Sequence, residues 1–251
     1  MIPYFEQPSL AAGGLVFYAF GFCAALALLL GWWLIVRRCQ VRLVSRDAAQ
    51  FTARILLGGL AGSAIFFYLL RGEFGLYSFG GIASGLAIAA TFARRQGLSP
   101  RQLLAYLDCV AFVFPAAWTL ARFGCFLAHE HVGQPASPAN WVAVAFPAGP
   151  RLDLGLIEML FSAALAAVFL LLDRFVRPAS PFFLTFFFTA YGAFRLFLDT
   201  LQLAPSFADR AFAGSSLTLG AALWLLTAFA DARPVPQSSQ HHHLTTPGVN
   251  A

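Results

Sequence analysis

Three polar side chains recur at helical spacing in a stretch that is otherwise apolar, residues 181–201. Tyr191, Arg195 and Asp199 follow one another at intervals of four residues, so on a helix they share one face. A charged side chain inside an apolar span costs about 2.5–3.5 kcal/mol on insertion scales, so such residues are rarely accidental. An internal ion pair that offsets its own burial and a functional site both explain this face.

Charged residues of both signs also mark the ends of neighbouring apolar segments. Arg122 ends one segment and Glu130 follows it, while Glu158 lies about one turn into the next segment, seven residues after Arg151. Each of these alone fits an interfacial side chain that extends toward water. Together they gather at one depth, and arginine suits planar, bidentate contact with phosphate. The pattern predicts a phospholipid headgroup site formed by Arg122, Glu130, Arg151, Glu158, Arg195 and Asp199.

Cysteines and histidines give weaker signals. His129 and His131 lie in a polar connection, where a general base and ordinary surface histidines are both open and the latter is favoured. Cys125, beside Arg122, is interpreted as a small packing residue because no activating base stands next to it. Asp108 is interpreted as structural or interfacial. No CxxC pair or zinc spacing occurs, so neither a metal site nor a disulfide framework is predicted from the four cysteines, Cys23, Cys39, Cys109 and Cys125.

The elements that position these residues follow from composition. Of the 251 residues 59% are hydrophobic and only 11% are charged, and mean hydropathy is +0.73. Soluble domains carry about 25% charged residues, so a soluble globule and a disordered chain are both excluded. Because the apolar runs approach 20 residues and show no alternation with a period of two, they indicate membrane-spanning helices.

Seven apolar segments predict an all-α integral membrane protein. They cover approximately residues 14–36, 55–70, 74–93, 103–120, 155–172, 181–201 and 213–230. We expect a single transmembrane domain over 1–233, with a long outer loop at 121–154. The polar tail 234–251 is expected to be disordered, and its histidines 241–243 are interpreted as a chance tract.

Arginine placement predicts the orientation. All 16 basic residues are arginine, and eleven of them fall in the connections 37–54, 94–102 and 173–180 or in the tail. The remaining five, on the other side or at helix ends facing it, are Arg71, Arg122, Arg151, Arg195 and Arg210. The richer side is expected to be cytoplasmic, with the N-terminus outside and the C-terminus inside. The arginines are scattered rather than clustered on one face, so nucleic-acid binding is not expected despite a pI near 9.4.

Residues 122–133 read RFGCFLAHEHVG and resemble RxGNFxNxExxG, the signature of the prolipoprotein diacylglyceryl transferase family. Further on, RLDLGLIE at 151–158 is similar to the family's RHPSQLYE, and YGAFRLFLD at 191–199 to its YGxFRxxxE. Nearer the start, GLVFYAFGF at 14–22 is similar to YGxxYxxGF and keeps Tyr18. The resemblance extends over roughly residues 10–230.

Several polar positions depart from the family pattern. Cys125 and Ala128 stand in place of two asparagines, and Asp199 stands in place of a glutamate. The family's SFHGGL is YSFGGI at 77–82, which keeps Gly80 and Gly81 without the histidine. Its GGRxG is GGLAG at 58–62, with Leu60 at the arginine position. These departures leave the fold implied by the resemblance intact and bear on the chemistry.

The resemblance implies an enzyme of the bacterial inner membrane that needs no cofactor and no metal. It implies transfer of a diacylglyceryl group from phosphatidylglycerol to the cysteine thiol of a prolipoprotein at the outer leaflet. The catalytic residues it implies are Arg122, Glu130, Arg195, Asp199 and Tyr191, and the substrate-binding residues are Tyr18, Gly80, Gly81, Gly133, Arg151 and Glu158. Glu130 and His129 are candidates for the missing base. A diverged transferase with another lipid or acceptor and a non-catalytic phospholipid-binding protein are the alternatives.

Overall fold

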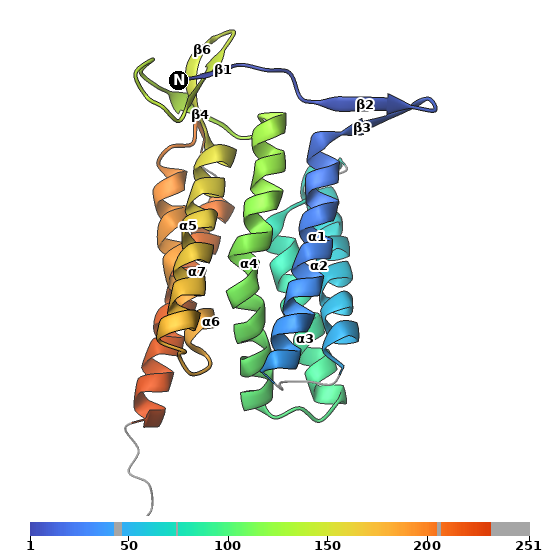
Figure 1. Ribbon diagram of the computed structural model, residues 1–251, viewed down its shortest axis with the longest axis vertical. Helices are drawn as coiled ribbons and strands as arrows, with labels where there is room; N and C mark the ends of the chain where they lie inside the picture. Colours follow the sequence, from blue (N-terminus) through green and yellow to red (C-terminus); the bar gives the residue numbers. More distant parts are fainter. Residues whose placement is uncertain (43–46, 74, 205–206, 232–251) are drawn as a thin grey trace, which may run out of the picture.

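The apolar segments form seven α-helices within the residues that this computed structural model describes, 1–42, 47–73, 75–204 and 207–231 (Figure 1). They are α1 (Ala19–Val41), α2 (Ala48–Arg71), α3 (Ser78–Arg95), α4 (Pro100–Ala128), α5 (Leu154–Phe175), α6 (Phe182–Asp199) and α7 (Phe207–Asp231). Five, namely α1, α2, α4, α5 and α6, are long and apolar enough to cross a membrane, and α7 holds a shorter apolar stretch at Arg210–Leu226. The chain is a mostly helical, multi-pass membrane protein, as composition predicts. The predicted tail 234–251 lies outside the described residues.

Helix α4 is the centre of the bundle. It lies between a group made of α1, α2 and α3 and a group made of α5, α6 and α7 (Figure 1). On one side Tyr106 and Cys109 pack with Phe51 and Phe92 of α2 and α3 in one buried cluster. On the other side Ala111 joins a second cluster that consists mainly of aromatic and leucine side chains from α5 and α6. Residues on α4 are thus positioned from both sides.

Side-chain caps fix where the central helices begin. At α4, the Ser99 hydroxyl accepts from the Gln102 amide at 3.3 Å and the Gln102 side chain accepts from the Ser99 amide at 2.8 Å, forming a capping box. At α5, Asp153 accepts from the Leu156 amide at 3.1 Å. At α6, the cap comes from another helix, since Asp108 accepts from the Leu184 amide at 2.9 Å. The structural interpretation of Asp108 is therefore confirmed.

The first helix begins later than the sequence predicts. The expected segment 14–36 includes β3 (Leu15–Tyr18), which pairs with β2 (Ser9–Ala12) in an antiparallel hairpin, and α1 begins only at Ala19. Gly13 and Gly14 form the turn with φ values of 59° and 79°, a conformation that glycine adopts without steric cost. The prediction was wrong here because an apolar strand next to a helix reads as one long apolar run.

A small sheet caps the bundle at the end where α4 finishes and α5 starts (Figure 1). Its strands are β4 (Val132–Pro135), β5 (Ala143–Phe146), β6 (Gly149–Asp153) and β1 (Ile2–Pro3), in the order β1-β5-β6-β4. Only the β1–β5 pair is parallel. The sheet occupies much of the predicted outer loop 121–154. That loop starts later than predicted, because α4 continues to Ala128 and ends at His129.

Candidate active site

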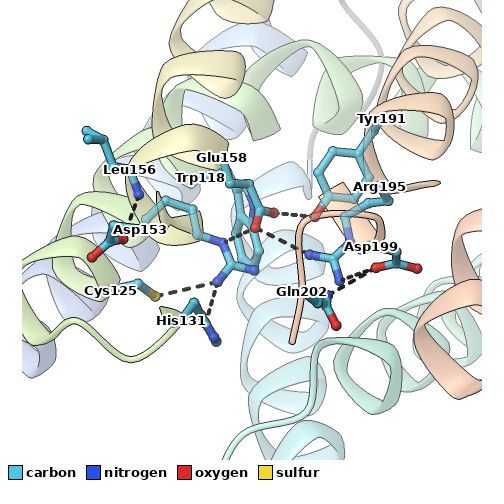
Figure 2. A network of polar contacts seen from close by, with 11 residues as sticks. Trp118, Cys125, His131, Asp153, Leu156, Glu158, Tyr191, Arg195, Asp199 and Gln202 are labelled. Carbon is cyan, nitrogen blue, oxygen red and sulfur yellow. Dashed lines mark hydrogen bonds and ion pairs between the residues drawn. The ribbon is translucent and has the colours of Figure 1, made fainter. Parts of the chain in front are cut away.

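Glu158 is the centre of a buried polar cluster near the start of α5. Its side chain is 2% exposed, and its Oε1 accepts hydrogen bonds from Trp118 Nε1 at 2.9 Å and from the Tyr191 hydroxyl at 2.7 Å. Its Oε2 lies 3.0 Å from Arg122 Nε and 3.4 Å from Arg195 Nη1 (Figure 2). One carboxylate therefore holds two guanidinium groups from two other helices.

Helices α4 and α6 bring the partners of Glu158 to it. Trp118 and Arg122 are one turn apart on α4, and the guanidinium carbon of Arg122 lies 4.6 Å from the centroid of the Trp118 ring. On α6, Tyr191 and Arg195 both point at Glu158 (Figure 2). Arg195 also lies 3.9 Å from Asp199, whose Oδ1 accepts from the Gln202 side chain at 3.0 Å. The structure thus places the 191–199 face toward the bundle interior.

The sequence predicts that Arg122 ends its helix, but α4 continues past Arg122 to Ala128. The chain keeps apolar residues through Ala128, and Gly124 does not break the helix. Gly124 instead allows α1 to approach, because a Cβ there would lie 2.8 Å from Cys23 Cβ and 3.2 Å from the Phe20 carbonyl oxygen. The close contact of α1 and α4 fixes the depth of Arg122.

The far end of the Arg122 guanidinium faces the loop. Nη1 donates to His131 Nε2 at 3.0 Å and lies 3.5 Å from Cys125 Sγ. Because arginine only donates, His131 accepts through Nε2 and carries its proton on Nδ1. Among the residues that the structure describes, no polar contact occupies Nη2. Arg122 is held at its Nε end and presents its other nitrogens away from Glu158.

The other residues expected at the site lie around this cluster or away from it. Glu130 is exposed next to Cys125, and desolvation raises the pKa of its carboxyl while the Arg122 charge opposes that rise. Arg151 is on β6, and the described residues show no contact between it and Glu158. Gly133, on β4, allows the chain after α6 to pass, since a Cβ would lie 2.9 Å from the Leu201 carbonyl oxygen. Tyr18 is 53% exposed at the start of α1.

Gly80 and Gly81 lie between α2 and α3, outside the Glu158 cluster. A Cβ at Gly80 would lie 2.9 Å from the Gly62 carbonyl oxygen, and one at Gly81 would lie 3.3 Å from the Gly59 carbonyl oxygen. Ser84 also donates to the Gly58 carbonyl at 3.2 Å across the same contact. Small residues at a membrane helix contact let the backbones approach, so close packing accounts for both glycines.

His129 is not the surface histidine that the sequence favours. Its side chain is 7% exposed, and Nδ1 lies 2.8 Å from Asp153 Oδ2. The ring stacks on Tyr4 with the centroids 5.4 Å apart and lies 4.5 Å from the centroid of Phe5. Burial raises the pKa of the Asp153 carboxyl, and His129 opposes that rise. The Tyr4 and Phe5 ring contacts hold the N-terminal segment against the end of α4, an arrangement that local sequence cannot reveal.

Sequence reasoning does not single out Trp118, His131 or Asp153 as partners. Trp118 precedes Arg122 by four residues, a helical spacing that could have indicated a shared face. Asp153 stands three residues before Leu156 at a helix start, which is the pattern of an N-cap. His131 gives no comparable signal, since its approach to Arg122 depends on how the chain turns after α4.

The arrangement suits an anion. Two guanidinium groups share one buried carboxylate, so this triad keeps one positive charge in excess, and Asp199 contacts Arg195 only at 3.9 Å. Charges in a site that excludes water interact more strongly than in water. A phosphate that approaches from the loop side would meet Arg122 first.

Comparisons with known proteins identify the family of this chain. The sequence profile of the family described as prolipoprotein diacylglyceryl transferase matches residues 8–231. The phosphatidylglycerol–prolipoprotein diacylglyceryl transferase of Gluconacetobacter diazotrophicus is 33% identical over 172 residues. That match covers 60% of this chain and 60% of the relative, so the chain spans less than two thirds of the relative's length.

Proposed function

We propose, from the premise that this chain belongs to the prolipoprotein diacylglyceryl transferase family, that it moves a diacylglyceryl group from phosphatidylglycerol to a prolipoprotein cysteine. The observation that carries the proposal is the pair of arginines held on the buried Glu158 carboxylate. These residues lie in stretches that resemble the family's motifs. Their chemistry is that of a phosphate site.

The transfer is a displacement at carbon. The thiolate sulfur of the acceptor attacks the glyceryl carbon that is bonded to the phosphate oxygen, and a C–S bond forms. The C–O bond breaks, and its electron pair goes to the oxygen of the departing glycerol phosphate. Negative charge therefore moves from sulfur to phosphate during the reaction, and the transition state gains from cations placed at the phosphate.

Arg122 and Arg195 supply those cations. A fixed guanidinium presents parallel N–H groups to two phosphate oxygens, which a flexible ammonium does not. Glu158 acts as a positioning residue, because its two oxygens hold both arginines and the Tyr191 hydroxyl. Asp199 contributes to the orientation of Arg195.

Glu130 is our candidate for the base that takes the thiol proton. The acceptor must reach the thiolate form, since the thiolate is the nucleophile. Glu130 is exposed at the end of the bundle where Arg122 lies, and its raised pKa brings it closer to that of a useful base. His129 is less suited, because its ring is buried against Asp153 and aromatic side chains.

The membrane placement belongs to the same proposal. All seven helices cross a bacterial inner membrane, with the sheet and the Glu158 cluster toward the outer leaflet. The ends of α1, α3 and α5 that lie opposite the sheet carry Arg38, Arg94, Arg95 and Arg174, as a cytoplasmic side would. Reporter fusions after residues 98 and 240 should report cytoplasm and a fusion after 140 should report periplasm. A periplasmic C-terminus would contradict the orientation.

The direct test uses purified protein in phosphatidylglycerol vesicles with a lipobox peptide. We expect glycerol phosphate to be released together with a diacylglyceryl thioether on the peptide cysteine. The second candidate, a non-catalytic phospholipid-binding protein, is favoured by the absent family histidine. It would bind the lipid and release no product under conditions in which another family member does.

A further inference from the structure

Three side chains at the end of α4 could ligate one metal ion. Cys125 Sγ, a carboxylate oxygen of Glu130 and a ring nitrogen of His131 all lie within 4.8 Å of one another, in the part of the chain that the structure describes. The left-handed conformation of His129, with φ 50°, ends the helix and turns the chain back. The Glu130 amide then bonds the Cys125 carbonyl at 3.3 Å, which brings the three residues together.

The chemistry of this set points to a particular class of ion. Thiolate, imidazole and carboxylate are the ligands of zinc, and three protein ligands leave a fourth position open. The soft sulfur also favours thiophilic ions over magnesium or calcium. We propose that Cys125, Glu130 and His131 form a binding site for a thiophilic divalent cation such as Zn²⁺ or Cd²⁺.

The charges at the site balance on binding. In the metal-free protein the Cys125 sulfur lies within 4.8 Å of a Glu130 carboxylate oxygen. The thiol gives its proton to water when the cation binds, and the thiolate and the carboxylate together offset the two positive charges. The neighbouring Arg122 guanidinium therefore meets a neutral metal centre. Glu130 and His131 are exposed, so their side chains can close on the ion without rearranging the core.

Binding competes with Arg122. His131 Nε2 accepts a hydrogen bond from Arg122 Nη1 at 3.0 Å, and Cys125 Sγ lies 3.5 Å from the same nitrogen. A cation that takes the sulfur and Nε2 removes both contacts and stands where a phosphate would reach Nη1. The site is therefore inhibitory and not part of the reaction. This consequence rests on the proposed function, whereas the metal site does not.

The test is a cadmium titration that follows the ultraviolet charge-transfer band of a cadmium–thiolate bond. It uses the whole chain with His241, His242 and His243 replaced by alanine, so that this run of histidines cannot contribute to cadmium binding. One equivalent of Cd²⁺ should produce the band, and excess Zn²⁺ should remove it. Cys125→Ser should abolish the band. Cys109→Ser, a change of another buried cysteine on α4, should leave it.

His131→Gln provides a second, independent variant. It keeps the thiol, so the band should persist, but the affinity for Cd²⁺ should fall by about 10-fold or more, since even indirect partners of a metal contribute 10–100-fold. This variant decides the matter if Cys125→Ser fails to fold. Absence of the band in the parent, its loss in Cys109→Ser, or unchanged affinity in His131→Gln would overturn the site.

Zinc should also lower glycerol phosphate release by the parent and leave the Cys125→Ser rate unaffected at the same concentration. Equal inhibition of both proteins would overturn the competition with Arg122. A metal-free parent that releases no product at all would count against the proposed function, and the cadmium titration would still decide the metal site.

Discussion

Helix α5 carries a carboxylate held by two arginines near each of its ends, and the two clusters differ in burial and geometry. Near its start, Glu158 is 2% exposed and lies 3.0 Å and 3.4 Å from Arg122 and Arg195. Near its end, Asp173 is 25% exposed. It accepts from Arg38 at 2.5 Å and 2.7 Å and from Arg42 at 2.5 Å.

The difference indicates that the Asp173 cluster is a structural ion pair and the Glu158 cluster is a binding site. At Asp173, Arg38 forms a bidentate pair that ties α1 to α5, and its guanidinium carbon also lies 3.6 Å from the centroid of the Phe112 ring. Here the two parallel N–H groups of the planar guanidinium bind one carboxylate and hold two helices together. At Glu158 the contacts are longer, and Arg122 turns its other nitrogens toward the loop. The tight bidentate pair at Asp173 stabilises the bundle, whereas the looser contacts around the buried Glu158 carboxylate leave the two arginines able to bind a second anion.

Of the changes proposed for these two clusters, Glu158→Gln should cause the largest loss of stability and of transfer activity. Removing the charge leaves two buried guanidinium groups without their anion, and breaking a buried pair costs about 3–5 kcal/mol. Transfer should fall by at least about 100-fold, because both phosphate-binding groups lose their anchor. Thermal unfolding in detergent and product release measure the two effects. A variant with parental stability would show that Glu158 does not hold the arginines.

Asp173→Asn should have a smaller effect, and only on stability. The carboxylate is partly open to solvent, so water replaces some of what is lost, and we expect about 1–3 kcal/mol of destabilisation. Product release per folded molecule should remain at the parental level. A selective loss of activity without loss of stability would indicate that the chemistry takes place near Asp173 and not near Glu158.

Asp199 should give the smallest effect of the three. Asp199→Asn should reduce transfer by less than about 10-fold, because the Asp199 carboxylate lies 3.9 Å from Arg195 and the closer Glu158 carboxylate remains in place. Asp199→Glu, which restores the acid of the family pattern, should be tolerated. Equal losses in the two variants would argue against a role for the carboxylate.

The sequence predicts most residues of the Glu158 cluster, because they are charged residues within or next to apolar segments. The spacing of Tyr191, Arg195 and Asp199 predicts a shared face, and the structure places that face toward Glu158. The spacing of Trp118 and Arg122 indicates a shared helix face but does not reveal which residue the Trp118 ring nitrogen bonds. The hydrogen bond from Trp118 to Glu158 spans 40 residues of chain and depends on how α4 and α5 pack.

In the fold, too, features that depend on neighbouring residues are predicted, whereas features that depend on residues far apart in the sequence are not. Hydropathy predicts the helices, because a membrane helix is defined by its own residues. Hydropathy places the start of α1 too early, since the apolar strand β3, LVFY, runs into the helix without a polar residue between them. It also leaves His129 at the surface, because Tyr4 and Phe5, which cover the ring, come from the opposite end of the sequence.

The most direct test makes the same charge-preserving change in both clusters. Arg122→Lys and Arg38→Lys each keep the charge and lose the fork. Product release and phosphatidylglycerol binding are measured side by side on the parent and both variants, per folded molecule. We expect Arg122→Lys to lower turnover by roughly 10²–10³, the effect of losing one transition-state donor, with a much smaller loss of lipid binding. Arg38→Lys should stay within about threefold of the parent, well short of the 1.4 kcal/mol that a tenfold change represents. Equal turnover in the two variants would contradict the claim that the Glu158 cluster stabilises the departing phosphate.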